Sequence, residues 1–548
     1  LERLDTTLGM LYNSSNSDRN ALYLCKEAEM SARKRLHGLF TFFRSSIDTA
    51  TLIRYGQQHY GLKNYRQALA CFTEAITMLP GFADTYNRRG LTYFELKQYE
   101  QALADFEHSL ALDPHQPEVY VWQGRTYHAL KNLQKATDAY SEAITISPRY
   151  IMAYNSRGWS YYELEMYSKA IDDFDMALTF NPHFAIAYTN RGLAYFKLKE
   201  YTRALQDFNQ AIVLDVKQKR AYFATGLVCH EIKDYKRAIT FYTHAIELDP
   251  TEHAIYIDRG WAYFSLNQYE QAIADYNHAL ELDPNYYLAY NNRGWAYYWL
   301  KQYEQAISDF DRALALNPLY GKSFVNRGLA YHQLKKYTLA LAEYKQALTI
   351  DPTEEKRVHL SSGATYCAIK EYAKSIAAYS RVIEIDPNDS AAYNNRGWDY
   401  YALKDSISAL ADFEYAISIN SNQTDSRLYA PYVNRAWIYA ERGEYQLALD
   451  DCNHVLQLCV KDEVAYAYRA RVYCLQGDYE QALADCACAL KIDPDIEDAY
   501  GVRGLVAYAQ QQYERALADF EKALTLGHNL FWLEETYDNT RRKLAEAR

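Results

Sequence analysis

Apolar, aromatic and small residues recur along most of this 548-residue chain with a period of 34 residues. In the unit of residues 83–116, Tyr86 and Gly90 lie at positions 4 and 8. Tyr99 and Phe106 follow at positions 17 and 24. Spacings of three, four and seven residues put side chains on one face of a helix. Each unit is therefore predicted to contain two amphipathic helices that form a hairpin.

The register predicts fourteen such units. Two steps between units are longer than 34 residues, because one residue is added before Gly363 and five are added before Ala436. The units begin at residues 49, 83, 117, 151, 185, 219, 253, 287, 321, 356, 390, 429, 463 and 497.

Proline and small residues have fixed places in the unit. Ten of the twelve prolines follow the second helix, as Pro114 does. Proline lacks an amide N–H and disfavours a helical residue before it, so it ends the helix. Position 8 is Gly or Ala, and position 20 is Ala in every unit except the one with Ser375. These small side chains let the two helices approach closely.

A 34-residue helical hairpin with these aromatic, glycine, alanine and proline positions resembles the tetratricopeptide repeat family. The resemblance extends over about 480 residues. It implies an all-α fold, a right-handed α-solenoid of about fourteen hairpins with a C-terminal capping helix. In this family the first helix of each unit lines a concave groove, and the second helix forms the convex back.

Two segments lie outside the repeat array of residues 49–528. Residues 1–48 are predicted to form a degenerate helical hairpin or a stalk. Residues 529–548 are predicted to form an amphipathic capping helix. The added residues near 420–428 are polar and lengthen the joint between units eleven and twelve, so we expect an exposed loop there.

The charge balance argues against nucleic acid as a partner. The chain has 59 basic and 70 acidic residues, a net charge of −11, and no long run of lysine or arginine. Phosphate binding requires concentrated positive charge. The sequence also lacks a stretch of about 18 apolar residues, so membrane insertion is not expected.

The nine cysteines follow the repeat register. Cys452 and Cys486 occupy position 24, where other units carry phenylalanine, and no Cys-x2-Cys pair occurs. We therefore expect core side chains, with a metal or redox site as the alternative, and we expect no metal and no cofactor. Unpaired cysteines favour the reducing cytoplasm.

One pair of positions changes together across the units. Position 7 is arginine in ten units, and in the same ten units position 23 is acidic, as in Arg293 and Asp309. In the other four units neither holds. A partly buried guanidinium needs a carboxylate partner to offset its desolvation. We therefore expect an ion pair within each of these ten hairpins, and shared duplication history is the alternative explanation.

Seven of the eight tryptophans lie at first-helix positions that line the groove in the family. Five of them occupy position 9: Trp159, Trp261, Trp295, Trp398 and Trp437. Large aromatic side chains supply much contact area at little cost in entropy. They are candidate peptide-binding residues, and the alternative is that they pack between neighbouring helices.

Asparagines at position 6 are the second set of candidate peptide-binding residues: Asn190, Asn292, Asn326, Asn395 and Asn434. A side-chain amide both donates and accepts, so a ladder of amides can hold an extended peptide backbone. This pattern resembles the asparagine ladder of the protein O-linked N-acetylglucosamine transferases. Repeats that clamp the C-terminal carboxylate of the large heat-shock chaperones have lysine at position 5, and no unit here does.

These patterns predict a non-enzymatic scaffold that binds an extended segment of a partner protein in the groove. No glycine-rich phosphate loop and no nucleophile with a matching base stands outside the repeat register. In the alternative interpretation, the array is the sensor or regulatory arm of a larger signalling NTPase, or the substrate-selecting part of a transferase. The catalytic domain would then precede Leu1.

Overall fold

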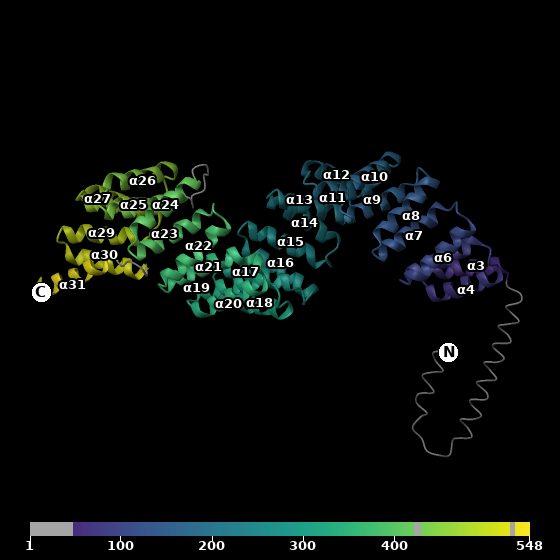
Figure 1. Cartoon of the computed structure of the whole chain (residues 1–548), viewed down its shortest axis with the longest axis horizontal. Helices are drawn as coiled ribbons and strands as arrows, with labels where there is room; N and C mark the ends of the chain where they lie inside the picture. The colour runs from purple at the N-terminus through teal and green to yellow at the C-terminus, as the bar shows by residue number, and fades with distance from the viewer. Residues whose placement is uncertain (1–47, 421–428, 527–531, 548) are drawn as a thin grey trace, which may run out of the picture. The chain divides into compact units, whose positions relative to one another are not determined.

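The chain is helical throughout the part that the structure describes. This computed structural model describes residues 48–420, 429–526 and 532–547, and within them it contains 29 α-helices and no strand (Figure 1). The predicted all-α fold is therefore confirmed. Nearly all of the predicted N-terminal hairpin or stalk, and the longer joint at 421–428, lie outside the described residues.

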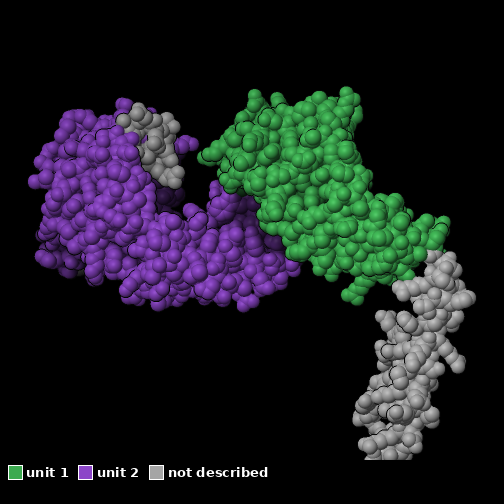
Figure 2. Space-filling view, turned by 45° about the vertical axis from the view of Figure 1, so that its right-hand side comes forward, with its two compact units in different colours: residues 1–251 green, residues 252–548 purple. Residues whose placement is uncertain are grey.

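Two compact units divide the chain, residues 1–251 and 252–548 (Figure 2). The helices of the first unit are α3 (Thr49–Gly61), α4 (Tyr65–Met78), α5 (Ala83–Glu95), α6 (Tyr99–Leu112), α7 (Pro117–Ala129), α8 (Leu133–Ile146), α9 (Ile151–Glu163), α10 (Tyr167–Phe180), α11 (Ala185–Lys197), α12 (Tyr201–Leu214), α13 (Lys219–Glu231) and α14 (Tyr235–Leu248).

The second unit continues the same alternation of helices. Its helices are α15 (His253–Ser265), α16 (Tyr269–Leu282), α17 (Tyr287–Trp299), α18 (Tyr303–Leu316), α19 (Gly321–Gln333), α20 (Tyr337–Ile350), α21 (Glu355–Ala368), α22 (Tyr372–Ile385), α23 (Ser390–Ala402), α24 (Ser406–Asn420), α25 (Ala430–Glu441), α26 (Tyr445–Leu458), α27 (Glu463–Gln476), α28 (Tyr479–Ile492), α29 (Glu497–Ala509), α30 (Tyr513–Leu526) and α31 (Glu534–Ala547).

Within each unit the helices pair as hairpins and the hairpins stack. The first helix of a repeat packs against the second, as α5 does on α6, and the second packs against the next first helix, as α6 does on α7. Successive first helices also contact one another, as α5 and α7 do, whereas successive second helices do so less. The first helices therefore lie on the inner side of the bend within each unit, and the stacked hairpins form an α-solenoid.

A glycine and an aromatic ring set how closely the two helices of a hairpin approach. A Cβ added to Gly90, at position 8, would lie 2.7 Å from the ring of Phe106, at position 24. All twelve units with glycine at position 8 have Phe or Tyr at position 24 and share this contact. In the remaining two units alanine faces cysteine: Ala436 with Cys452 and Ala470 with Cys486. The two positions therefore fill one small volume between them.

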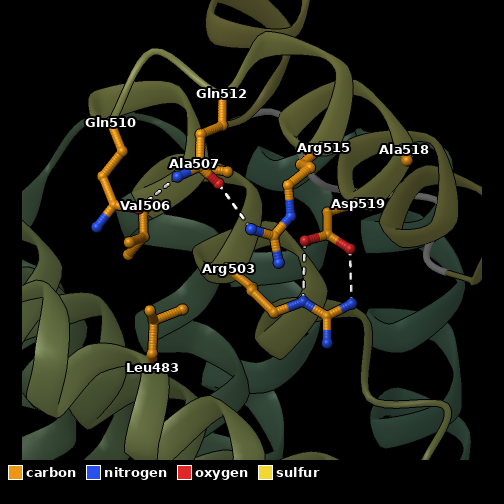
Figure 3. Close-up of a pocket in the computed structure, with 9 residues that line it drawn as sticks. All are labelled: Leu483, Arg503, Val506, Ala507, Gln510, Gln512, Arg515, Ala518 and Asp519. Carbon is orange, nitrogen blue, oxygen red and sulfur yellow. Dashed lines mark hydrogen bonds and ion pairs between the residues drawn. The ribbon is translucent and has the colours of Figure 1, made fainter.

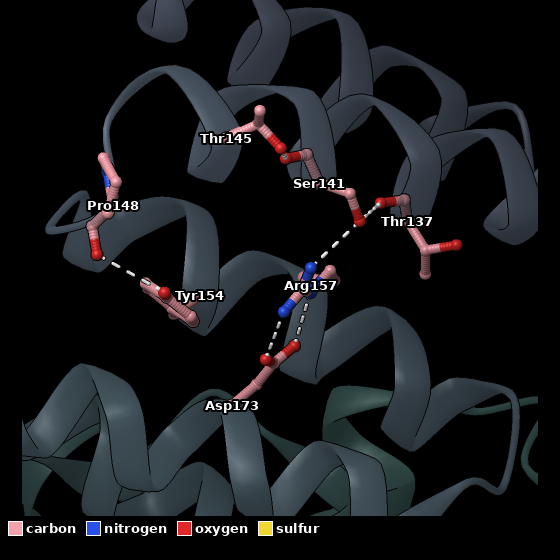
Figure 4. A network of polar contacts seen from close by, with 7 residues as sticks. All are labelled: Thr137, Ser141, Thr145, Pro148, Tyr154, Arg157 and Asp173. Carbon is pink, nitrogen blue, oxygen red and sulfur yellow. Dashed lines mark hydrogen bonds and ion pairs between the residues drawn. The ribbon is translucent and has the colours of Figure 1, made fainter.

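The ion pair predicted within each hairpin is confirmed. In all ten units with arginine at position 7, the guanidinium lies 2.6 to 2.7 Å from the acid at position 23. Arg157 donates from Nε and Nη2 to the two carboxylate oxygens of Asp173 (Figure 4). Burial raises the pKa of Asp173, and the hydrogen bonds from Arg157 oppose this rise. Two charge-assisted bonds thus offset the cost of burying the charges.

The same arginine also reaches the preceding repeat. Arg157 Nη1 donates to Ser141 Oγ, at position 25 of the repeat before, over 2.9 Å (Figure 4). The equivalent bond joins six further pairs: Arg89 with Thr73, Arg191 with Asp175, Arg293 with Asn277, Arg327 with Asp311, Arg396 with Ser380, and Arg469 with Asn453. The position-7 side chain therefore joins its own helix to two second helices.

Two pockets lie where this three-way contact is incomplete. Before Arg503 the position-25 residue is Ala487, and a pocket of about 400 Å³ lies beside the pair of Arg503 and Asp519 (Figure 3). In the repeat that begins with α21, Ser362 and Ala378 replace the ion pair and line a pocket of about 600 Å³. Both pockets lie where a bonding side chain is missing, so we interpret them as gaps in packing.

The turn inside each hairpin contains a left-handed residue at position 15. At twelve non-glycine residues φ lies between 57° and 64°, and most of these residues are lysines, such as Lys301. Glycine takes this position only at Gly443 and Gly477. A left-handed conformation costs a residue with a side chain about 1 to 2 kcal/mol. The close packing of the two helices therefore overrides a local preference in nearly every repeat.

The irregular joints differ in part from the sequence prediction. The single residue inserted between units nine and ten is taken up by a short 3-10 helix, η1 (Pro352–Glu354), directly before α21. The capping helix is predicted for 529–548. In the structure α31 begins at Glu534, and residues 529–531 lie outside the described part. Trp532 and Leu533 precede α31 in a turn, and α31 packs against α30.

The shared volume of positions 8 and 24 leads to a test. In Gly294→Ala the new Cβ would lie 2.8 Å from Phe310, so we expect a loss of about 1 to 3 kcal/mol of stability from overpacking. Phe310→Cys leaves a cavity when made alone. Combined, the two changes recreate the alanine and cysteine pair, and the double variant should be more stable than the sum of the single effects by about 1 to 3 kcal/mol. Urea unfolding followed by circular dichroism measures this, and additive effects would contradict it.

Candidate binding surface

The first helices present the predicted groove positions on one face. We use the name helix-A face for the side chains at positions 2, 5, 6, 9, 12 and 13 of the first helices. Neighbouring first helices contact one another, so this face continues from repeat to repeat within each unit. Because each repeat rests on the next in an equivalent way, side chains at one position form a row.

Three position-9 tryptophans stack on the aromatic ring at position 12 of the same helix. The stacked pairs are Trp159 with Tyr162 (4.8 Å between ring centroids), Trp261 with Phe264 (5.2 Å) and Trp295 with Tyr298 (4.8 Å). The two rings are inclined by 18° or less in each pair. Stacking holds each indole in one orientation against its own helix, which reduces the entropy that a partner would have to remove.

The tryptophans differ in how much of their surface is open to solvent. Trp261 is 39% exposed, and Trp299, at position 13, is 50% exposed. Three others are partly buried: Trp159, Trp295 and Trp398. Trp437 is only 4% exposed. The predicted row is therefore present on the first helices, but its members offer unequal areas for contact.

The position-6 asparagines bond mainly to the neighbouring repeat. Asn190, Asn326 and Asn434 are buried, and each donates from Nδ2 to the position-5 asparagine of the repeat before, over 2.7 to 3.0 Å. Asn292 and Asn395 are more exposed, and each accepts a longer bond from the asparagine beside it. The amides thus link repeats, and part of their hydrogen-bonding capacity is already used.

Arginines at position 2 connect three successive repeats. The Arg220 guanidinium lies 4.3 Å from the centroid of the Trp159 ring, two repeats earlier, and its Nη1 donates to Asn190 Oδ1 in the repeat between over 3.3 Å. Arg357 repeats the arrangement with Trp295, at 5.6 Å, and with Asn326. Partial desolvation of the guanidinium lowers the pKa of Arg220, although the side chain as a whole is exposed. Among the described residues, no carboxylate forms an ion pair with it.

At the C-terminal end of the second unit, the chain's own tryptophan covers the helix-A face. The Arg471 guanidinium lies 3.5 Å from the centroid of the Trp437 ring and 5.3 Å from that of Trp532. The two indoles meet edge to face, 5.5 Å apart. Arg471 Nη2 also donates to Glu441 over 3.2 Å. These contacts leave Arg471 only 7% exposed and account for the burial of Trp437.

Comparison of single positions across the repeats misses these arginines. Position 2 varies from repeat to repeat, and arginine occurs there only at isolated repeats such as those of Arg220 and Arg357, so these arginines do not form a row. The signal that identifies them extends over three repeats: tryptophan at position 9, asparagine at position 6 of the next repeat, and arginine at position 2 of the one after. It occurs once in each of the two compact units, at Trp159, Asn190 and Arg220 and at Trp295, Asn326 and Arg357. The contact of Trp532 with Trp437 has no repeat spacing and gives no such signal.

The helix-A face offers aromatic surface, amides and guanidinium groups. In the part of the chain that the structure describes, no group of three His, Cys, Asp or Glu side chains could hold a metal ion. Across the same residues, no helix is both long enough and apolar enough to cross a membrane.

Family models match the chain over more than half of its length. Models described as tetratricopeptide repeat match residues 83–116, 117–150, 151–184, 185–217, 219–252, 241–274, 287–320, 321–354 and 465–529, and one described as TPR repeat matches 260–301. Among curated proteins, none matches the chain.

Several solved structures are similar to this chain over part or most of its length. A chain in the crystal structure of the APC/C hetero-tetramer Cut9-Hcn1 matches with 13% identity over 84% of this chain and 96% of that chain, with a TM-score of 0.42. A tetratricopeptide repeat protein from Parabacteroides merdae matches with 22% identity over 47% and 98%, with a TM-score of 0.36. YrrB, described as a TPR protein with an unusual peptide-binding site, matches with 22% identity over 34% and 95%, with a TM-score of 0.29.

Asp498, at position 2 beside Arg471, leads to a prediction on pH. Burial raises the pKa of Asp498 to about 7, Glu497 adds to the rise, and Arg471 opposes it. Because the folded chain holds this proton more tightly than the unfolded chain, the stability it contributes is present below about pH 4 and is lost as the pH rises to about 7. Asp498→Asn should therefore be more stable than the wild type at pH 8 by more than about 1 kcal/mol, and nearly equal at pH 4. Urea midpoints at both pH values test this, and equal gains at both would contradict it.

Proposed function

This chain belongs to the tetratricopeptide repeat family, and we propose that it is a non-enzymatic scaffold that binds an extended segment of a partner protein along the helix-A face. Arrays of such repeats generally serve protein interaction. The eight unpaired cysteines in the described residues support a reducing compartment, so we propose the cytoplasm as its location.

The observation that carries this proposal is the row of stacked tryptophans on the first helices. Trp261 and Trp299 keep 39% and 50% of their surface exposed although both belong to a closely packed array. They are also neighbours in space, because Tyr269 contacts both. It stacks on Trp299 at 6.4 Å and meets Phe264, the ring under Trp261, edge to face at 5.3 Å. Exposed aromatic surface of this kind usually marks an interaction site.

The geometry favours an extended segment over a compact ligand. The face repeats the same side-chain positions from one first helix to the next, so a chain laid across the repeats meets a new set of contacts at each step. The more exposed amides of Asn292 and Asn395 can bond a peptide backbone, since each still has unused donors. Hydrogen bonds from the amides to the peptide backbone, together with contacts to the aromatic rings, would hold an extended segment.

The test uses the full chain and a random peptide library. Peptides selected on the wild type are measured by fluorescence anisotropy against Trp261→Ala and Trp299→Ala, which should each weaken binding by about 2 kcal/mol. Both indoles are exposed, so the helical signal should remain unchanged.

Matched controls come from exposed apolar residues on second helices of the same unit. Leu339 is 48% exposed and Ile407 is 80% exposed. Leu339→Ala and Ile407→Ala should leave the affinity of the selected peptides unchanged. If these two changes weaken binding as much as the tryptophan changes do, the helix-A face is not the binding surface and the proposal fails.

A further inference from the structure

The guanidinium groups of Arg220, Arg357 and Arg471 have similar surroundings, but that of Arg471 has one tryptophan contact more than the other two. Each guanidinium lies over the ring of a position-9 tryptophan. Only at Arg471 does a second indole, that of Trp532, contact the guanidinium as well. Of these three arginines, Arg471 is therefore covered by a second indole, and Arg220 and Arg357 each have a single tryptophan contact among the described residues.

The exposure of the side chains follows this difference. Arg471 is 7% exposed under Trp532. The side chain of Arg357 is 36% exposed, and Arg220 is exposed. All three arginines contact a position-9 tryptophan. The lack of a second indole therefore accounts for the open guanidinium surface at Arg220 and Arg357.

The carboxylate partners differ as well. Arg471 donates to Glu441 over 3.2 Å, and Arg357 approaches Glu354 only at 3.5 Å. Arg220 pairs with no described carboxylate, and of its guanidinium nitrogens only Nη1 has an acceptor among the described residues, the Asn190 amide. A partly desolvated guanidinium without a carboxylate is unfavourable, and a ligand that brings one removes this cost.

We propose that the pairs of Trp159 with Arg220 and of Trp295 with Arg357 each bind an aromatic side chain of the partner that lies next to an acidic residue. The aromatic ring covers the open face of the guanidinium, as Trp532 covers Arg471, and the carboxylate accepts from its free N–H groups. This inference rests on the proposed function, because it specifies which extended segments the helix-A face selects.

Acidic residues also stand close in sequence to the internal occupant, although the carboxylate that contacts Arg471 is that of Glu441. Trp532 is followed after one residue by Glu534 and Glu535, both exposed at the start of α31. A guanidinium over an aromatic face gains roughly 0.5 to 2 kcal/mol, more when solvent is excluded. An aromatic residue with a nearby acid therefore supplies both missing contacts at Arg220 from one short segment. At Arg357 it supplies the missing ring and a second carboxylate beside Glu354.

The two arginines are also held in place before a ligand arrives. Asn190 Oδ1 accepts from Arg220, and Asn190 Nδ2 donates to Asn155 over 3.0 Å. Asn326 holds Arg357 in the same way and donates to Asn291 over 3.0 Å. An arginine fixed by an amide and an indole loses little freedom on binding, which favours affinity.

The experiment examines the sequences of the library peptides selected on the full wild-type chain. We expect enrichment of an aromatic residue beside Asp or Glu, and replacement of that aromatic residue by leucine should weaken binding about tenfold. The double variant Arg220→Gln with Arg357→Gln should weaken the same peptides about tenfold. Arg220→Lys with Arg357→Lys keeps the charge without the planar group, so it should recover only part of the affinity.

The matched control is Arg203→Gln, an exposed arginine of α12 that pairs with Glu200 and lies outside the helix-A face. It should leave binding unchanged, and circular dichroism should report the same helicity for all variants. If the selected peptides need Trp261 and Trp299 but tolerate leucine and bind the double glutamine variant normally, this inference is overturned while the proposed function stands. If the binding of the selected peptides does not depend on the helix-A face at all, both this inference and the proposed function fail.

Discussion

The arginine at position 7 fixes the geometry on which the rest of the array depends. Its guanidinium makes two hydrogen bonds to the acid at position 23 and, in seven described repeats, a third bond to position 25 of the repeat before. One side chain therefore joins three helices. Since a guanidinium is buried only where carboxylates or other acceptors receive its N–H groups, these bonds admit one arrangement of the helices. Beside it, glycine against an aromatic ring sets the distance between the two helices.

The proposed binding surface follows from this regularity. Because each hairpin rests on the next in the same way, a residue at position 9 recurs on the same face and makes a row of indoles rather than scattered aromatics. The indoles stack on position 12 of their own helix, so they are oriented before any partner binds. In our proposal, selectivity comes from departures from the repeat, such as Arg220 and Arg357, which connect one repeat to the second one before it.

The sequence predicts the repeated part of the structure well, because each repeated feature has a local physical reason. The helical spacing, the proline that ends each unit and the co-occurrence of arginine with an acid all lie within one hairpin. Features that depend on neighbours are harder to predict. Lys301 is left-handed because two packed helices require a sharp turn, although its own preference is against it. The burial of Trp437 depends on Trp532, almost a hundred residues later and outside the repeat register.

The candidate site shows the same limit. The row of position-9 tryptophans is visible in the sequence, but the partners of the asparagines are not. Asn190 and Asn155 lie in different repeats, and their bond appears only when the register between the repeats is known. Arg220 requires three repeats to be placed together. Prediction from sequence therefore extends as far as the hairpin and stops where one repeat contacts another.

The most direct test of the role of position 7 installs the ion pair in a repeat that lacks it. The repeat formed by α7 and α8 has Gln123 and Ala139 at positions 7 and 23, and Glu107 stands at position 25 of the repeat before. Ala139→Asp alone should destabilise the chain by about 2 kcal/mol or more, because Ala139 is 6% exposed and the new carboxylate would be buried without a partner. Adding Gln123→Arg should restore stability, with a coupling of about 1 to 3 kcal/mol in a double-mutant cycle of urea unfolding. If the effect of Ala139→Asp is the same with and without the arginine, position 7 does not determine how the helices are held together.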